Sequence, residues 1–193
     1  MPADRALFDN AVREAKKLVA KVVRPGNICL DATCGNGQDT AILAQLVGVD
    51  GRVYAFDVQK VALEQTQSRL NSKNLANRVT LIHDGHHKLM KHISDQLSCA
   101  MFNLGYLPGG NKEITTQPET TIQALEQATK LLRPWGLISM VIYTGHPGGE
   151  EEAASVEGWI SGLDQNQWVV VRLTYPNRQH HPPYLLAVQK RGG

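Results

Sequence analysis

The sequence predicts a doubly wound α/β fold, with a seven-stranded, mostly parallel sheet, an antiparallel last strand and helices on both faces. Three observations predict it. Short apolar runs alternate with helix-length segments along most of the 193 residues, which is typical of repeated βαβ units. A strand-like segment that ends in Asp31 continues through Gly35-Asn36-Gly37 into a helix. The proline-rich segment 175–183 is too short for a crossover helix, so the last two strands are expected to be an antiparallel pair.

The expected elements follow one another in a regular order. An amphipathic helix over 3–23 ends at Pro25-Gly26. Strands are then expected at 27–32, 52–57, 79–83, 97–103, 136–143, 168–174 and 184–189. Helices are expected at 37–46, 59–73, 87–93, 118–131 and 150–162. Because no linker, repeat or low-complexity tract interrupts this order, we expect one domain over 1–193, with the helix within 1–24 packed on it.

The composition is that of an ordinary globular domain, with 42% apolar and 20% charged residues. No apolar run approaches the length of a membrane span, and the N-terminus lacks the layout of a secretory signal. A cytoplasmic protein without a membrane partner is therefore expected. Cys29, Cys34 and Cys99 show no C-x-x-C spacing, and His86 and His87 have no further ligands at metal spacing. Neither a disulfide framework nor a metal site is predicted.

The segment 27–37 predicts a site for a nucleotide-type cofactor. The next apolar strand ends in Asp57, about twenty residues after the glycine loop, where a carboxylate accepts hydrogen bonds from a ribose diol. A dinucleotide fingerprint has another glycine three residues after Gly37, whereas this chain has Thr40. An oxidoreductase that uses a dinucleotide is therefore disfavoured. The remaining pattern, acid-x-Thr-x-Gly-x-Gly, is similar to the first motif of class I methyltransferases, which bind S-adenosylmethionine.

Polar or glycine-rich sequence follows each of the predicted parallel strands. Ligands of open α/β sheets sit beyond the carboxyl ends of the strands, so the site is expected at segments 31–37, 57–59, 84–86, 103–110 and 143–149. The cofactor-binding residues expected there are Asp31, Thr33, Gly35, Asn36, Gly37, Gln38, Asp39, Thr40, Asp57, Gln59, Asp84, Gly85, His86 and Asn103.

Two loops carry the candidate catalytic residues. Methyltransferases that act on amino groups place a polar residue followed by an aromatic one after the fourth strand, where this chain has FNLGYLPGG at 102–110. Asn103 is expected to hold an amine through its carbonyl oxygen, and Tyr106 to wall the methyl-transfer channel. After the fifth strand, the glycines of YTGHPGG at 143–149 are typical of a lid, with Tyr143 and His146 facing the acceptor.

Four motifs together resemble those of one family, the small bacterial class I methyltransferases called rRNA methylases. They are DATCGNGQDT at 31–40, AFDVQ at 55–59, FNLGYLPGG at 102–110 and YTGHPGG at 143–149. The resemblance covers nearly the whole chain, and NLGYLPGG is its most specific part, with Asn111 where an acid is expected. It implies methyl transfer from S-adenosylmethionine to the primary amine of 5-aminomethyl-2-thiouridine at the tRNA wobble position.

The same resemblance implies contact with the anticodon region of tRNA. A net charge of +2 permits a nucleic-acid partner without arguing for one, and favours a compact substrate element or a homodimer that pools two basic rims. The residues expected to bind the substrate are Gly105, Leu107, Pro108, Gly109, Lys112, Arg178 and His180. Alternatives that stay open are a methyltransferase acting on rRNA, a protein or a small-molecule amine, and a non-catalytic subunit that binds the cofactor.

Overall fold

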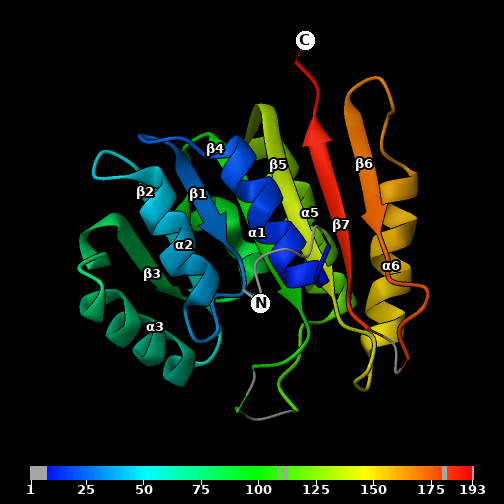
Figure 1. The fold of residues 1–193 in the computed structure, drawn as a ribbon, viewed down its shortest axis with the longest axis horizontal. Coiled ribbons are helices and arrows are strands. Elements are labelled where there is room, and N and C mark those ends of the chain that lie inside the picture. Colours follow the sequence, from blue (N-terminus) through cyan, green and yellow to red (C-terminus); the bar gives the residue numbers. More distant parts are fainter. Residues whose placement is uncertain (1–7, 108, 111–112, 180–181, 193) are drawn as a thin grey trace, which may run out of the picture.

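The computed structural model describes residues 8–107, 109–110, 113–179 and 182–192. Within these residues, seven strands form one sheet in the order β3-β2-β1-β4-β5-β7-β6 (Figure 1). The strands are β1 (Ile28–Asp31), β2 (Arg52–Asp57), β3 (Val79–His83), β4 (Leu97–Leu104), β5 (Leu132–Ile142), β6 (Trp168–Leu173) and β7 (Tyr184–Lys190). Strands β1 to β5 run parallel, and β7 is antiparallel to both of its neighbours. The predicted sheet is confirmed. Its two edge strands are β3 and β6, because β7 lies between β5 and β6.

Helices cover both faces of the sheet (Figure 1). They are α1 (Ala11–Val22), α2 (Gln38–Val47), α3 (Lys60–Ser72), α4 (Leu89–His92), α5 (Pro118–Leu131) and α6 (Gly149–Ser161). Helices α1, α2 and α3 lie on one face, and α5 and α6 lie on the other (Figure 1). None of the described helices is long and apolar enough to cross a membrane.

Three elements differ clearly from their predicted bounds. Helix α1 begins at Ala11 because the Asn10 side chain caps it by accepting the N–H of Arg13 at 2.9 Å; residues 3–7 of the predicted helix lie outside the described residues. The helix expected at 87–93 is a 3₁₀ turn followed by the single turn of α4. Strand β5 starts early, with an irregularity between Leu132 and Leu137, where Trp135 has a left-handed backbone (φ +63°).

The core follows the period of two along the central strands. On β4, Phe102 faces α5 and α6, whereas Met101 faces α1 and α2. Both faces of these strands are therefore buried, which explains why they read as continuous apolar runs. The three cysteines are buried and free.

One buried carboxylate ties the loop after β4 to helices α5 and α6. Glu152, in the first turn of α6, is only 1% exposed and accepts two hydroxyl groups, those of Thr116 and Thr121, each at 2.6 Å. The backbone N–H of Thr116 in turn donates to the carbonyl of Gly105 at 2.9 Å. Gly105 and Thr116 are thus tied to both α5 and α6.

This anchor predicts a loss of stability on truncation. Glu152→Ala should lower the free energy of unfolding by about 2–4 kcal/mol, because the buried hydroxyl of Thr121 and the half-buried hydroxyl of Thr116 lose their acceptor. Urea unfolding followed by circular dichroism measures the change. The matched control is Glu151→Ala, which removes an exposed acid from the same helical turn and should change the value by no more than about 0.5 kcal/mol. Equal urea midpoints for the two variants would show that the anchor contributes nothing.

Candidate active site

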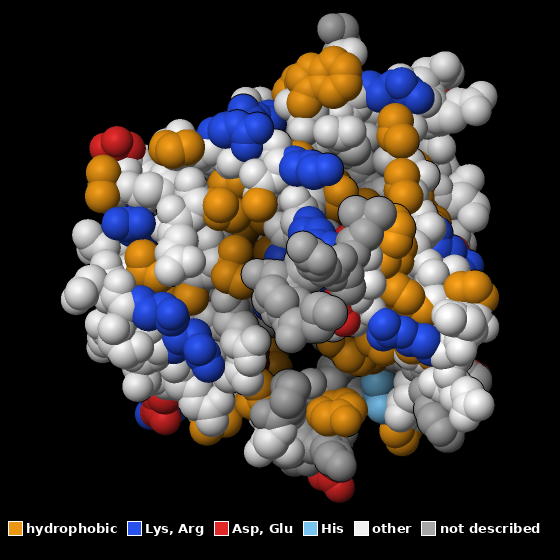
Figure 2. Space-filling view, in the orientation of Figure 1, with side chains coloured by type: hydrophobic (Ala, Val, Ile, Leu, Met, Phe, Trp, Pro, Cys, Tyr) orange, Lys and Arg blue, Asp and Glu red, His pale blue; other side chains and the backbone are white. Residues whose placement is uncertain are grey.

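The carboxyl ends of β1 to β5 surround a single cleft of about 770 Å³. Figure 2 shows the molecule hollowed between α1 and the loop that follows β4. Sixteen of the predicted site residues line the cleft: Thr33, Gly35, Asn36, Gln38, Asp39, Asp57, Gln59, Asp84, Gly85, His86, Asn103, Gly105, Tyr106, Leu107, Gly109 and Tyr143. Residues far apart in the chain therefore meet at the edge of the sheet where the strand-end rule predicts a ligand.

Other predicted residues lie elsewhere. Asp31, Gly37, Thr40, His146 and Arg178 are not among the residues that line the cleft. The Arg178 guanidinium donates to the carbonyl of Asp9, just before α1, and lies over the ring of Tyr175. Pro108, Lys112 and His180 lie outside the described residues.

The glycine loop is held against the end of β2 by a carboxylate. Asp57 accepts the backbone N–H of Gly35 through Oδ2 and that of Gln59 through Oδ1, both at 2.9 Å. Thr66 on α3 donates its hydroxyl to the carbonyl of Gly35, also at 2.9 Å. Each Asp57 oxygen keeps a second lone pair, so the carboxylate is still able to accept hydrogen bonds from a ligand in the cleft. Burial raises the pKa of Asp57.

Gly37 is required by packing between helices. It caps α2 with a left-handed backbone (φ +75°), and a Cβ placed on it would lie 2.8 Å from Oγ1 of Thr66. Any side chain here would push α3 away from the loop. The second glycine of the motif therefore permits close approach of a helix, whereas Gly35 lines the cleft itself.

Asp31 lies beneath the loop and is completely buried. Its Oδ2 accepts the Thr40 hydroxyl at 2.6 Å, and its Oδ1 accepts the backbone N–H of Thr33 at 3.3 Å. Burial, and then the neighbouring charge of Asp39, raise the pKa of Asp31 to about 7, although the Thr40 hydrogen bond opposes the shift. Asp31 and Thr40 thus support the loop from inside the protein.

At the β3 end of the cleft, Asp84 is held by several hydrogen-bond donors. Its Oδ1 accepts the N–H of Gly85 at 2.8 Å and the Lys88 ammonium at 2.6 Å, and its Oδ2 lies 3.1 Å from Nε2 of His92. Lys88, followed by His92, holds the pKa of Asp84 well below its usual range. Asp84 is therefore ionised, and several of its lone pairs are already occupied.

His86 offers an unpaired acceptor at the same end. Its Nδ1 lies 3.2 Å from the carbonyl of Ala32, and because a carbonyl only accepts, Nδ1 carries the proton. Burial lowers the pKa of His86 to about 4, so the ring is neutral and Nε2 carries a lone pair. That buried nitrogen has no hydrogen-bond partner among the described residues.

At the β4 end, two hydrogen bonds fix Asn103. Its backbone N–H donates to Oγ1 of Thr33 at 2.8 Å, and its side-chain Nδ2 donates to Oδ2 of Asp39 at 2.9 Å. The carbonyl oxygen of the side chain is the group left for a ligand. Tyr143 stands nearby on the cleft wall, and burial, then the charge of Asp39, raise its pKa, so its phenol stays protonated at neutral pH.

His146 stands behind Tyr106. The two rings meet edge to face, with centroids 6.0 Å apart and an angle of 88° between planes. The Nδ1 of His146 lies 2.9 Å from the carbonyl of Pro147 and so carries the proton, which leaves Nε2 as a lone-pair acceptor. This Nε2 is buried, lies beside Gly105 and has no hydrogen-bond partner among the described residues.

Sequence reasoning missed one wall of the cleft. The residues involved lie on α1, on the turn after β3 and in the threonine-rich segment that leads into the first turn of α5: Val12, Lys16, His87, Ile114, Thr115, Thr116, Gln117 and Thr120. The TTQPETT run at 115–121 was a usable signal, because hydroxyl and amide groups gather there a short distance along the chain after Gly109 and Gly110. Nothing local in α1 indicates that it passes over the cleft.

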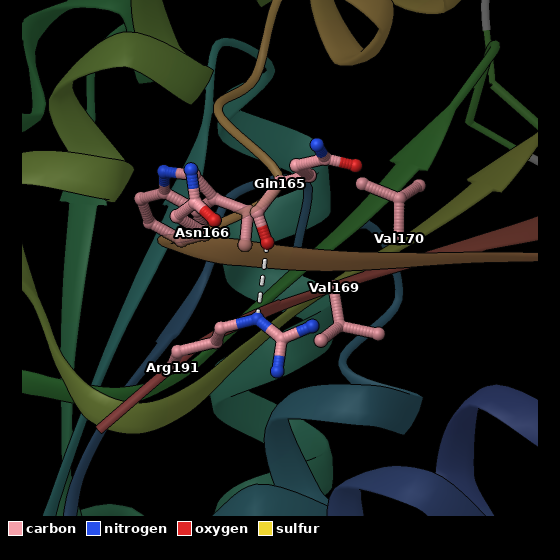
Figure 3. Close-up of a pocket in the computed structure, with 6 residues that line it drawn as sticks. Gln165, Asn166, Val169, Val170 and Arg191 are labelled. Carbon is pink, nitrogen blue, oxygen red and sulfur yellow. Dashed lines mark hydrogen bonds between the residues drawn. The ribbon is translucent and has the colours of Figure 1, made fainter. Parts of the chain in front are cut away.

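A second hollow, of about 570 Å³, lies where β6 begins, at the opposite end of the sheet from the cleft. Gln165, Asn166, Val169, Val170 and Arg191 line it together with a tryptophan, and Nε of Arg191 donates to the carbonyl of Gln165 at 3.1 Å (Figure 3). None of these described lining residues is a carboxylate or a histidine, so this hollow offers no acid–base chemistry.

Comparison with known proteins places these features in a family. Residues 53–189 match the sequence model of the family described as "Putative rRNA methylase". A curated relative from Arabidopsis thaliana, named "tRNA (mnm(5)s(2)U34)-methyltransferase, chloroplastic", is 42% identical over 172 residues, which is 84% of this chain. The chain spans 63% of the length of that relative.

Solved structures agree with this assignment. A protein from Clostridium thermocellum, described as a "putative rRNA-methylase", superposes with a TM-score of 0.94 at 44% identity, over 96% of this chain and 100% of its own. A "putative methyltransferase" from Streptococcus mutans, solved in complex with SAH, superposes with a TM-score of 0.88 at 33% identity, over 95% and 99% of the two chains.

The buried carboxyl of Asp31 predicts a pH dependence of stability. Its pKa is about 7 in the folded protein and 3.8 ordinarily, so between pH 4 and 7 the unfolded chain releases a proton that the folded chain keeps. Across this range the wild type should lose up to about 4 kcal/mol of unfolding free energy relative to Asp31→Asn, and the difference should be constant above pH 7.

Urea unfolding of both proteins at a series of pH values measures this difference. Comparison between variants is needed because the lowered pKa of His86 changes stability in the opposite direction over much of the same range. Asp50→Asn, at an exposed carboxylate, is the control. A difference between wild type and Asp31→Asn that does not vary from pH 4 to 7 would contradict the prediction.

Proposed function

The chain belongs to the rRNA methylase family, and on that premise we propose that it transfers a methyl group from S-adenosylmethionine to an amine of RNA. The acceptor we propose is the primary amine of 5-aminomethyl-2-thiouridine at the tRNA wobble position, because the Arabidopsis relative carries the name of that modification. The observation that carries the proposal is Asn103, whose amide nitrogen is bound to Asp39, so that its carbonyl oxygen is left to receive an amine.

The cleft residues fit S-adenosylmethionine. When bound, this cofactor supplies a methyl group attached to a positively charged sulfur. Asp57 retains lone pairs suited to ribose hydroxyls, and the unpaired Nε2 of buried His86 is suited to an N–H donor of an adenine edge. A ligand that satisfies this nitrogen removes the cost of leaving it buried without a partner.

The residues at the β4 and β5 end of the cleft are suited to orienting the amine and to removing its proton. The Asn103 carbonyl oxygen accepts one N–H of the neutral amine and so directs the nitrogen lone pair, while Tyr106 and Tyr143 wall the channel. Holding the two reactants in line contributes up to roughly 7–11 kcal/mol to lowering the barrier. An alkylamine is largely protonated at neutral pH, so a base must take its proton. His146 does not line the cleft but packs against Tyr106, and the lone pair at its Nε2 is suited to receive the proton along a path out of the cleft.

RNA is the substrate class that the family description and the names of the Arabidopsis and Clostridium thermocellum proteins share. Lysine and arginine side chains are spread over the α1 face of the molecule, above the hollow (Figure 2). We propose that the anticodon region approaches the cleft from this side, with backbone phosphates near these cations. The guanidinium of Arg178 donates one hydrogen bond to the carbonyl of Asp9, and its other N–H groups are those we propose for a phosphate of the RNA. A single catalytic domain, a homodimer and a cytoplasmic location also stay predictions; the Arabidopsis relative is chloroplastic.

The function is tested by methyl transfer to bulk tRNA. The substrate is tRNA from cells that lack wobble-uridine methylation, incubated with labelled S-adenosylmethionine and digested for nucleoside analysis by mass spectrometry. The expected product is 5-methylaminomethyl-2-thiouridine. Label in another tRNA nucleoside would contradict the acceptor, and transfer only to rRNA or to small amines would favour the alternative that the family description suggests.

Cofactor binding is measured separately, by calorimetry with S-adenosylhomocysteine. Asp57→Ala should weaken binding about 10- to 100-fold, because hydrogen bonds to a charged acceptor are lost. Asp50→Ala, at an exposed carboxylate, is the control and should bind as the wild type does. Full affinity in Asp57→Ala would overturn the assignment of the cofactor to this end of the cleft.

A proton role for His146 predicts a changed pH profile. His146→Gln keeps the size of the side chain but removes the base, so turnover at neutral pH should fall about 10²-fold. The loss should shrink as the pH rises, because the amine then loses its proton without help. His83→Gln, at an exposed histidine, is the control. A His146→Gln profile that matches the wild type at every pH would exclude the role.

A further inference from the structure

Helix α1 brings a cation to the acceptor end of the cleft. The helix contacts β4, β5, β7 and α2, and two of its side chains, Val12 and Lys16, line the cleft. The ammonium of Lys16 lies 3.1 Å from Oδ1 of Asp39. The two groups form an ion pair, but their geometry is not that of a hydrogen bond. Lys16 and Asp39 both precede the segment 53–189 that the family model matches.

Asp39 joins this cation to Asn103. It stands in the first turn of α2 and is 8% exposed. Its second oxygen, Oδ2, accepts Nδ2 of Asn103 at 2.9 Å. Lys16, Asp39 and Asn103 therefore form one continuous polar chain that runs from α1 across the start of α2 to the end of β4.

The charge on Asp39 decides which way the Asn103 amide faces. An ionised carboxylate only accepts hydrogen bonds, so it selects the NH₂ end of the amide and leaves the carbonyl oxygen for the cleft. A neutral carboxyl has an O–H donor and is able to pair with the carbonyl end instead. A buried carboxylate is costly unless it is paired, and Lys16 supplies the pairing charge, together with the N-terminus of α2.

We propose that Lys16 and Asp39 are positioning residues that hold the Asn103 carboxamide with its oxygen toward the methyl acceptor. The proposal rests on the proposed function for the identity of that acceptor. Neither residue needs to touch the amine. Helix α1, which resembles a simple cover for the sheet, then completes the acceptor site.

Steady-state kinetics of four variants tests the contacts that link Lys16, Asp39 and Asn103. Lys16→Met and Asp39→Ala should each lower kcat about 10- to 100-fold, because a misoriented amide no longer aligns the amine. The KM for tRNA should change less than about threefold in both variants, and so should the affinity of Lys16→Met for S-adenosylhomocysteine, a difference of under 1 kcal/mol. Lys16→Arg should restore most of the turnover. The double variant should be no slower than Asp39→Ala alone, since residues that act as one unit are not additive.

Lys17→Met is the matched control. Lys17 is the next residue on α1 and pairs with Glu14, so its replacement removes the same charge without reaching Asp39. Its kcat should equal that of the wild type. If Lys16→Met weakens cofactor affinity as much as it lowers kcat, Lys16 contacts the cofactor and the proposal is wrong. Additive losses in the double variant would overturn it as well.

A second measurement does not depend on methyl transfer. The side-chain NH₂ signals of Asn103 are identified by nuclear magnetic resonance from their absence in Asn103→Ser. They should shift or broaden in Lys16→Met and stay unchanged in Lys17→Met. Equal signals in the two variants would overturn the chain of contacts even if the wild type is active. Shifted signals in a protein that does not methylate RNA would leave the contacts standing and reject the proposed function.

Discussion

The Asp57 carboxylate fixes the geometry on which the rest of the cleft depends. By accepting one N–H from the glycine loop and one from the start of α3, it joins the end of β2 to the turn that follows β1. Thr66 completes the attachment from the body of α3. Once the loop is held, Thr33 receives the backbone N–H of Asn103, so the end of β4 is aligned with it. Three strand ends are thereby placed by hydrogen bonds to a few loop atoms.

Charge is distributed unevenly along the cleft. Asp84 at one end is paired with the Lys88 ammonium and contacts the ring of His92, while Asp57 in the middle is held by backbone N–H groups. Asp39 at the other end is paired with Lys16. The middle carboxylate is therefore the one whose partners are neutral, and it keeps the most freedom to bind uncharged hydroxyl groups. This arrangement agrees with a ligand such as S-adenosylmethionine, in which a ribose lies between an uncharged adenine and a charged methionine part.

Local sequence predicted the fold closely because its signals are local. Apolar runs, helix caps and glycine turns placed β2, β3 and α5 at the residues where they are found. Part of the candidate site could be predicted for the same reason, because the carboxyl ends of parallel strands meet at one edge of the sheet whatever the details of packing. The depth of a residue is not local: Asp31 ends β1 as Asp57 ends β2, yet one is completely buried and the other lines the cleft. The reach of Lys16 depends on where α1 packs, which no motif in the helix encodes.

The buried thiol of Cys34 has a consequence for the durability of the enzyme. Cys34 lines the cleft in which we place an activated methyl group, and sulfur is the strongest nucleophile that a protein carries in its ordinary side chains. Only the thiolate attacks, and burial, then the charges of Asp31 and Asp57, raise the pKa of Cys34 well above its usual value. The carboxylates that shape the cofactor loop therefore also keep this sulfur protonated. A thiol kept in this form is not the nucleophile that would take a methyl group from the cofactor.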